Sequence, residues 1–297
     1  MRKILSLLLC LPFLFFAAGE SGIDDAIRQE TQPLPDAARS VPTAYTTPTD
    51  EKGTVQKIEY TARDWFRGDG TYTKHAYVYL PHGYDPDGSY PLLILCHGIG
   101  GNEAEWGMTN LTSKVAVIMD NLIQKGEIRP FIIVTPNGRA GSTTDPGAFY
   151  AFGSEIRNDL LPYLEAHYAV SLDRSERAMA GLSMGGMQTI NIGMGECMDL
   201  FSWFGAFSAC PTTHTASEIA AGLNRQEENI NFFYSICGTN DNIAYASACA
   251  AVNGLPDLTD KLSEENFLRQ EQPGAHDFYI WYLGFFNFAR IFGSGTR

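Results

Sequence analysis

The chain has 297 residues, of which 44% are hydrophobic and 19% charged, enough for one large domain or two small ones. Its formal net charge is −13, with 34 acidic residues against 21 lysines and arginines. Such an acidic chain without a basic run excludes a protein that holds a nucleic-acid backbone, and it suits a neutral or polymeric substrate.

The first residues have the pattern of a secretory signal peptide. Arg2 and Lys3 precede an apolar run over residues 4–16, and small residues follow at 17–19. The run is short for a membrane span, so we expect a signal over residues 1–19, with a retained anchor as the alternative. The sequence thus predicts export to the extracellular space or periplasm, without stable membrane association after signal removal.

Residues 20–55 are rich in Pro, Thr, Ala and Asp and show no sustained apolar period. They predict a linker or an extended N-terminal segment, followed by one globular domain over residues 56–297. Five cysteines remain after the signal, so at least one thiol has no partner within the chain. A bridge between Cys210 and Cys237 is one option, and no CxxC spacing indicates zinc.

Strand-like and helix-like segments alternate through the globular part. Apolar runs predict strands at 75–80, 91–96, 130–136, 177–182, 203–208 and 231–237, and a further strand-like stretch covers 266–272. Helices are predicted over 113–127, 154–170 and 277–292. This alternation predicts an α/β fold with a mostly parallel central sheet and helices on both faces. Ligands of such sheets bind beyond the C-terminal ends of the strands.

A serine lies between two glycines at one of these strand ends. In Gly181-Leu182-Ser183-Met184-Gly185, the serine directly follows the strand 177–182 and precedes a helix-compatible stretch. This context is typical of a nucleophile elbow, where the chain turns so sharply that only small residues fit beside the serine. A serine hydroxyl is a weak nucleophile, so a base must lie within hydrogen-bond reach.

The order of residues after Ser183 indicates the base and the acid. Two histidines follow Ser183. His276 lies in a loop after a strand-like stretch. For His214, no strand would carry an acid from the segment between it and Ser183 to the site. Asp241 follows the strand 231–237 in a Gly- and Asn-rich loop and would orient the imidazole. Asp277 is expected to cap the last helix. The remaining acids are expected on a polar, solvated helical stretch: Asp257, Asp260, Glu264 and Glu265.

A glycine-rich turn supplies candidate donors for an oxyanion. His97-Gly98-Ile99-Gly100-Gly101 follows the strand 91–96. We expect the backbone amides of Ile99 and Met184 to form the oxyanion hole, with His97 bracing the turn through its side chain.

Several stretches together resemble a known family: "VYLPHGYDPDGSYPLLILCHGIGGNEAEW", "RAMAGLSMGGMQTINIG", "FSAC", "CGTNDN" and "GAHDFYIWYLGFFNF". They are similar to the first carbohydrate esterase family, the esterase-D-like group of α/β-hydrolases, and most of all to feruloyl esterase domains of bacterial xylanases. The resemblance implies an α/β-hydrolase fold and a triad of Ser183, Asp241 and His276. It implies feruloylated or acetylated xylan, or xylo-oligosaccharides, as substrate, and no metal or organic cofactor.

Some features leave alternatives open. Trp106, Phe152 and Trp281 are candidate aromatic surfaces for a ferulate ring or a sugar face, with core packing as the alternative. Ala275 and Cys210 depart from the family pattern where glycine and alanine are common. Besides a secreted serine esterase, the sequence admits an acyltransferase or thioester hydrolase on the same fold, or a non-catalytic carbohydrate-binding relative.

Overall fold

The computed structural model describes residues 36–68, 70–110 and 113–295. The predicted signal peptide and the first part of the predicted N-terminal segment lie outside these residues. Within the described ranges, no helix is both long and apolar enough to cross a lipid bilayer.

One sheet of eight strands forms the centre of the described domain, in the order β1-β2-β4-β3-β5-β6-β7-β8. The strands are β1 (Thr54–Arg63), β2 (Thr71–Leu80), β3 (Leu92–Cys96), β4 (Ile132–Pro136), β5 (Arg177–Leu182), β6 (Trp203–Phe207), β7 (Phe232–Gly238) and β8 (Phe267–Gln272). β2 pairs antiparallel with both β1 and β4, and every other neighbouring pair is parallel. The predicted α/β fold with a mostly parallel sheet is confirmed.

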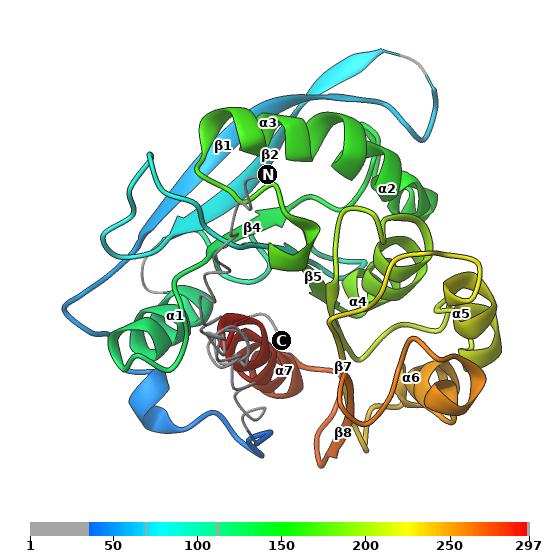
Figure 1. Ribbon diagram of the computed structural model, residues 1–297. Coiled ribbons are helices and arrows are strands. Elements are labelled where there is room, and N and C mark those ends of the chain that lie inside the picture. Colours follow the sequence, from blue (N-terminus) through cyan, green and yellow to red (C-terminus); the bar gives the residue numbers. More distant parts are fainter. Residues whose placement is uncertain (1–35, 69, 111–112, 296–297) are drawn as a thin grey trace, which may run out of the picture. The chain divides into compact units, whose positions relative to one another are not determined.

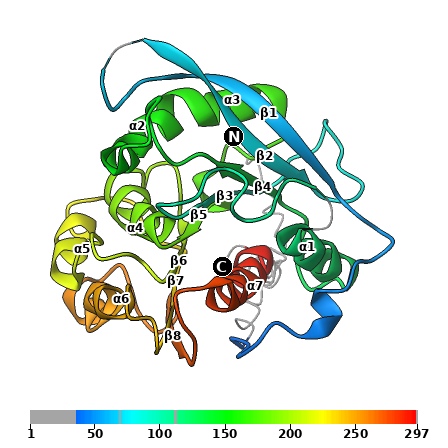
Figure 2. The ribbon, with the colours of Figure 1, turned by 180° about the vertical axis from the view of Figure 1, so that it is seen from behind.

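Helices cover both faces of this sheet (Figures 1 and 2). The helices are α1 (Lys114–Gln124), α2 (Phe152–Glu155), α3 (Leu161–His167), α4 (Met184–Gln188), α5 (Ala216–Leu223), α6 (Tyr245–Val252) and α7 (Phe278–Gly293). α1 and α7 pack with one face of the strands, and α2, α3, α5 and α6 pack with the other. The strands β3 to β7 are buried along their whole length, because helices cover them on both sides.

Short 3-10 and π segments join or extend these helices. A π segment at Ile156–Leu160 connects α2 to α3, and another at Thr189–Met194 extends α4. The 3-10 turns lie at Thr43–Tyr45, Pro146–Ala151, Arg174–Glu176 and Leu255–Leu258.

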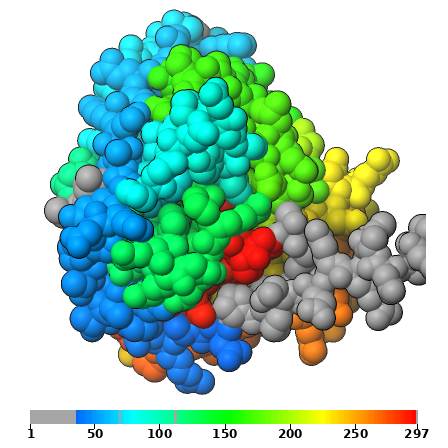
Figure 3. Space-filling view, turned by 60° about the vertical axis from the view of Figure 1, so that its left-hand side comes forward, coloured from blue at the N-terminus to red at the C-terminus, as the bar shows by residue number. Residues whose placement is uncertain are grey.

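The described part of the N-terminal segment packs on the domain. The Ala38 amide donates to Asn287 Oδ1 at 2.9 Å, and Asn287 Nδ2 donates to the Ala38 carbonyl at 3.0 Å. The Tyr45 ring meets Phe286 of α7 edge to face at 4.9 Å. In Figure 3, this blue segment lies against the green residues of α1. The packed unit therefore begins before the predicted boundary at residue 56.

The two edges of the parallel strands carry different segments. The loops after β3, β5, β7 and β8 lead to His97, Ser183, Asp241 and His276, so these residues share the C-terminal edge. At the other edge, the Arg129 amide, just before β4, donates to the Gly293 carbonyl at the end of α7 at 2.9 Å.

Candidate active site

Ser183 occupies a tight turn between a strand and a helix. β5 ends at Leu182 and α4 begins at Met184, so one residue alone reverses the chain direction. Its φ is 52°, in the left-handed region, where a side chain other than glycine costs about 1–3 kcal/mol. The serine amide donates to the Phe207 carbonyl of β6 at 2.9 Å, which anchors this conformation to the neighbouring strand.

The flanking glycines allow the turn to pack on β3. A side-chain carbon at Gly185 would lie 2.5 Å from the Cys96 carbonyl oxygen, and one at Gly181 would lie 2.6 Å from the Gly185 carbonyl carbon. Real side-chain carbons do not approach backbone atoms so closely. The pattern of small residues around Ser183 therefore has a steric cause, as the predicted elbow requires.

The structure brings the three predicted residues together from separate loops. The Ser183 hydroxyl lies 3.1 Å from His276 Nε2, and His276 Nδ1 lies 2.7 Å from Asp241 Oδ2. A carboxylate accepts only, so Nδ1 carries the proton and Nε2 is free to accept from the serine. This hydrogen-bonded chain has the geometry of a nucleophile, a general base and an orienting acid.

The Asp241 carboxylate is buried but well supplied with donors. Its Oδ1 accepts from the amides of Ile243 at 3.0 Å and Ala244 at 2.8 Å. Burial would raise the pKa of Asp241, but the hydrogen bonds from the Ala244 amide and from His276 outweigh it and hold the pKa below its usual value. Asp241 therefore stays ionised and fixes the tautomer of His276.

Backbone amides beside Ser183 are available for an oxyanion. Met184 provides the first amide of α4, and such amides have no partner inside a helix. The loop of Ile99 passes directly beside the serine, because a side-chain carbon at Gly98 would lie 3.5 Å from Ser183 Cβ. Both predicted donors thus belong to segments next to the nucleophile.

His97 braces the glycine-rich loop, as the sequence suggested. Its Nδ1 donates to the Gly98 carbonyl at 2.7 Å, and its Nε2 accepts from the Gly138 amide at 2.9 Å. Burial lowers the pKa of His97 to about 4, so the ring is neutral near pH 7. A neutral ring suits its two bonds, since one nitrogen must donate and the other accept.

Sequence reasoning missed three side chains that support this site. Ser208 has a φ of 49° at the end of β6, and its hydroxyl contributes to lowering the pKa of Asp241. Glu105 accepts from the Gly98 amide at 2.6 Å, and Arg139 donates to the Gly101 carbonyl at 3.0 Å and to the Ile99 carbonyl. Ser208 and Arg139 both follow strands, so the strand-end rule could have found them.

Two of the three predicted aromatic surfaces lie in the core. Trp106 and Phe152 are fully buried, so neither presents a face to a substrate, and for them the prediction is wrong. Trp106 packs among aromatic rings of α7 and donates to the Cys96 carbonyl at 3.0 Å. Trp281 is 8% exposed and meets the His276 ring edge to face at 5.1 Å, so it contacts the predicted base.

The described residues also test the expectations for the cysteines, for Asp277 and for the polar stretch after residue 254. All five cysteines from Cys96 to Cys249 are free, so Cys210 and Cys237 form no bridge. Asp277 caps α7 by accepting from the Tyr279 amide at 3.0 Å, as predicted. The polar stretch after residue 254 forms only the 3-10 turn Leu255–Leu258, not the expected helix. Within the described ranges, no three His, Cys, Asp or Glu side chains group to hold a metal ion.

Comparison with known proteins gives a consistent result. Residues 73–254 match the family described as "Putative esterase". Endo-1,4-beta-xylanase Y of Acetivibrio thermocellus is 31% identical over 258 residues, which cover 80% of this chain and 23% of that protein. Endo-1,4-beta-xylanase/feruloyl esterase of Xylanibacter ruminicola is 30% identical over 244 residues, covering 77% and 30%. This chain spans less than a third of the length of either relative.

Solved structures with the same fold include two esterases. The feruloyl esterase module of Clostridium thermocellum, solved with sinapinate, has a TM-score of 0.71 and 26% identity, covering 89% of this chain and 96% of that one. The CE1 ferulic acid esterase of Anaeromyces mucronatus has a TM-score of 0.73 and 24% identity, covering 86% and 98%.

Proposed function

Because this chain belongs to the esterase family and is similar to feruloyl esterase modules, we propose that it hydrolyses feruloyl esters of xylan through a serine acyl-enzyme. The hydrogen-bonded chain from Ser183 through His276 to Asp241 carries this proposal. It supplies the nucleophile, base and orienting acid that ester cleavage requires.

The first half of the reaction transfers the acyl group to the enzyme. Ser183 Oγ attacks the ester carbonyl carbon while His276 Nε2 takes the hydroxyl proton. The amides of Ile99 and Met184 stabilise the negative oxygen of the tetrahedral intermediate, an effect worth roughly a hundredfold in rate per donor. His276 then gives its proton to the departing sugar hydroxyl, and the acyl group remains on Ser183.

The second half regenerates the serine. Water enters, loses a proton to His276 Nε2 and attacks the acyl carbonyl. The second tetrahedral intermediate collapses, His276 returns the proton to Ser183 Oγ, and the carboxylic acid leaves. Asp241 stabilises the imidazolium in both halves, and its lowered pKa keeps it ionised for this role.

A buried apolar cluster lies beside the nucleophile. Phe149, Met184, Met187 and Cys210 form this cluster, and the Cys210 amide donates to the Ser183 carbonyl at 3.2 Å. Phe149 and Met187 are fully buried and Met184 and Cys210 are each 5% exposed, so the cluster supports the loop beside Ser183 rather than presenting an open face to the acyl group. The relatives named for feruloyl ester cleavage support a feruloyl rather than an acetyl group.

Export is part of the proposal, because a cell-wall polymer cannot enter a cell. It rests on the signal-like pattern of residues 1–19, which lie outside the described residues. The test is the N-terminal sequence of the protein released by a host that carries the full gene. We expect a mature chain that begins near residue 20, and an intact Met1 in the released protein would contradict export by signal cleavage.

Replacing the nucleophile tests the mechanism. We expect Ser183→Ala to lower kcat/KM on methyl ferulate roughly 10⁴-fold or more, because only oxyanion stabilisation and binding remain. A fluorophosphonate probe should label the wild type and not the variant. Wild-type rates from Ser183→Ala would contradict the proposal.

Substrate comparison tests the acyl preference. We expect kcat/KM to be higher on methyl ferulate than on acetylated xylan, because the similar proteins are named for feruloyl ester cleavage. The reverse order would assign an acetylxylan esterase. Adding a competing alcohol and analysing the products separates hydrolysis, which yields free ferulate, from acyl transfer, which yields a new ester.

A further inference from the structure

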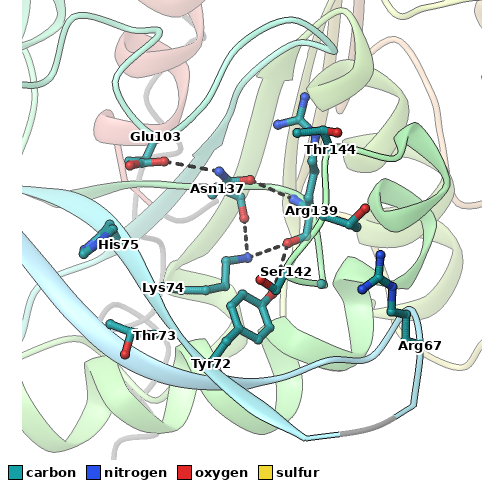
Figure 4. A pocket seen from close by; sticks show the side chains of 12 residues that line it. Arg67, Tyr72, Thr73, Lys74, His75, Glu103, Asn137, Arg139, Ser142 and Thr144 are labelled. Carbon is teal, nitrogen blue, oxygen red and sulfur yellow. Dashed lines mark hydrogen bonds between the residues drawn. The ribbon is translucent and has the colours of Figure 1, made fainter.

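A polar cavity of about 560 Å³ lies on the same edge of the sheet as the triad but contains no triad residue (Figure 4). It is formed by the start of β2 and by the loop that follows β4. Its lining includes Arg67, Lys74, Glu103 and Arg139 together with several hydroxyl side chains. The volume falls in the range of small-molecule sites, whereas the lining is far more polar than is usual.

Arg139 joins this cavity to the proposed oxyanion loop. It lines the cavity, and its guanidinium donates to the Ile99 and Gly101 carbonyls. In the sheet, β4 and β2 lie on one side of β3 and β5, and the strands that carry Asp241 and His276 lie on the other. A substrate whose ester is at Ser183 therefore has this cavity on the side away from the base.

The charge of the cavity differs from that of the whole chain. Although the formal net charge is −13, the lining includes three cationic residues and one carboxylate. The Lys74 ammonium is already engaged, since it bonds Glu155 at 2.6 Å and the Asn137 and Arg139 carbonyls at 2.6 and 2.8 Å.

Arg67 is the cation that is free to meet a ligand. Among the described residues, its guanidinium has no ion-pair or hydrogen-bond partner, and the side chain is exposed. Figure 4 draws Arg67 on the side of the cavity away from Glu103 and His75. The nearby Asp64 carboxylate accepts from the backbone amides of Arg67 at 2.8 Å and Ser142 at 3.3 Å, not from the Arg67 guanidinium. Hydroxyl groups of Thr73, Ser142 and Thr144 complete a lining suited to a polyol.

We propose that this cavity binds an acidic sugar unit, a hexuronate, of the carbohydrate that carries the ester, with Arg67 pairing to its carboxylate. The inference rests on the proposed esterase function for the direction of the substrate. A guanidinium pairs with a carboxylate through two parallel hydrogen bonds, which gives both affinity and orientation.

Binding of oligosaccharides without any ester tests the cavity separately from catalysis. Isothermal titration calorimetry would compare xylotetraose bearing one glucuronate branch with unbranched xylotetraose. We expect the wild type to bind the acidic sugar about tenfold more tightly than the neutral one, because the free energy of a hydrogen bond to a charged group corresponds to about that difference in affinity. Raising the salt concentration should reduce the difference. Equal affinities for the two sugars would overturn the proposal, whatever the esterase assays give.

Variants identify the residue responsible. Arg67→Gln should abolish the preference for the acidic sugar and Arg67→Lys should retain part of it. Arg225→Gln is the matched control, because Arg225 is an exposed arginine outside the cavity, and it should leave the preference unchanged. With feruloylated forms of both sugars, Arg67→Gln should lower the ratio of kcat/KM values, acidic over neutral, by about tenfold. A preference that survives Arg67→Gln would contradict the assignment.

Discussion

Asp241 holds His276 in one tautomer through a single hydrogen bond of 2.7 Å. An asparagine at this position could present its amide nitrogen to the imidazole and favour the opposite tautomer, with the proton on Nε2. We therefore expect Asp241→Asn to lower kcat about 10⁴-fold on methyl ferulate while the fold remains intact. Steady-state kinetics and a thermal melt measure both quantities.

The matched control for that variant is Asp277→Asn. Asp277 is adjacent to His276 in sequence but caps α7, and asparagine caps helices as well as aspartate does. Its activity and melting temperature should stay close to wild type. An Asp241→Asn enzyme with more than a tenth of wild-type kcat would argue against an orienting role.

His97 makes the stability of the fold depend on pH. Its pKa is lowered to about 4 by burial, whereas an unfolded histidine titrates near 6.5. Between these values the unfolded chain binds a proton that the folded chain does not. The stability linked to His97 is therefore fully present above pH 6.5 and is lost as the pH falls toward 4.

Urea unfolding at pH 7.5 and pH 4.5 measures this dependence. We expect the wild type to lose about 2 kcal/mol more than His97→Gln over this interval, because glutamine does not titrate. The comparison concerns the change with pH, so a constant cost of the substitution cancels. Equal losses in the two proteins would contradict a neutral, buried His97.

At the scale of elements, the turn from β5 into α4 depends on its glycines. We expect Gly185→Ala to destabilise the fold by about 2 kcal/mol or more and to lower activity, because its methyl group would meet the Cys96 carbonyl at 2.5 Å. Gly222→Ala in α5 meets open space and should stabilise by about 0.5–1 kcal/mol. Denaturant unfolding of both variants checks the contrast.

The elements that could be predicted are those whose own residues show the burial of the element. β5 was predicted over the residues it occupies, because both of its faces are buried and every position is compatible with a core. β1 was missed, because exposed polar residues such as Lys57 and Glu59 interrupt its buried residues, so it has no continuous apolar run like that of β5. The triad loops were found because parallel strands bring their C-terminal ends to one edge.

Burial of single side chains was harder to predict. For Trp106 the sequence left a ligand surface and core packing open, and rings of Phe207, Phe278 and Phe285, all distant in sequence, enclose it. An aromatic residue suits a ligand surface and a core equally well, so residue type does not distinguish them. The support from Arg139 depends on which carbonyls the fold places within its reach, which spacing does not reveal.

At the scale of the whole molecule, residues 36–53 contribute to the stability of the domain. Ala38 bonds Asn287 twice, and Tyr45 packs on Phe286. We expect a chain that begins at residue 54, with β1 intact, to melt roughly 5–10 °C below one that begins at residue 36, because several packed groups of α7 become exposed. Calorimetry of the two chains measures this difference. Identical melting temperatures would mean that the segment is only a passive extension.

The end of α7 accepts a hydrogen bond from the Arg129 amide at the edge of the sheet opposite Ser183. A surface or bead attached through the end of α7 would therefore hold the molecule on the side opposite the triad. The mouth of the site would then face outward, where an insoluble fibre can reach it. Immobilisation at this end should accordingly preserve turnover on particulate cell wall better than random coupling through lysines.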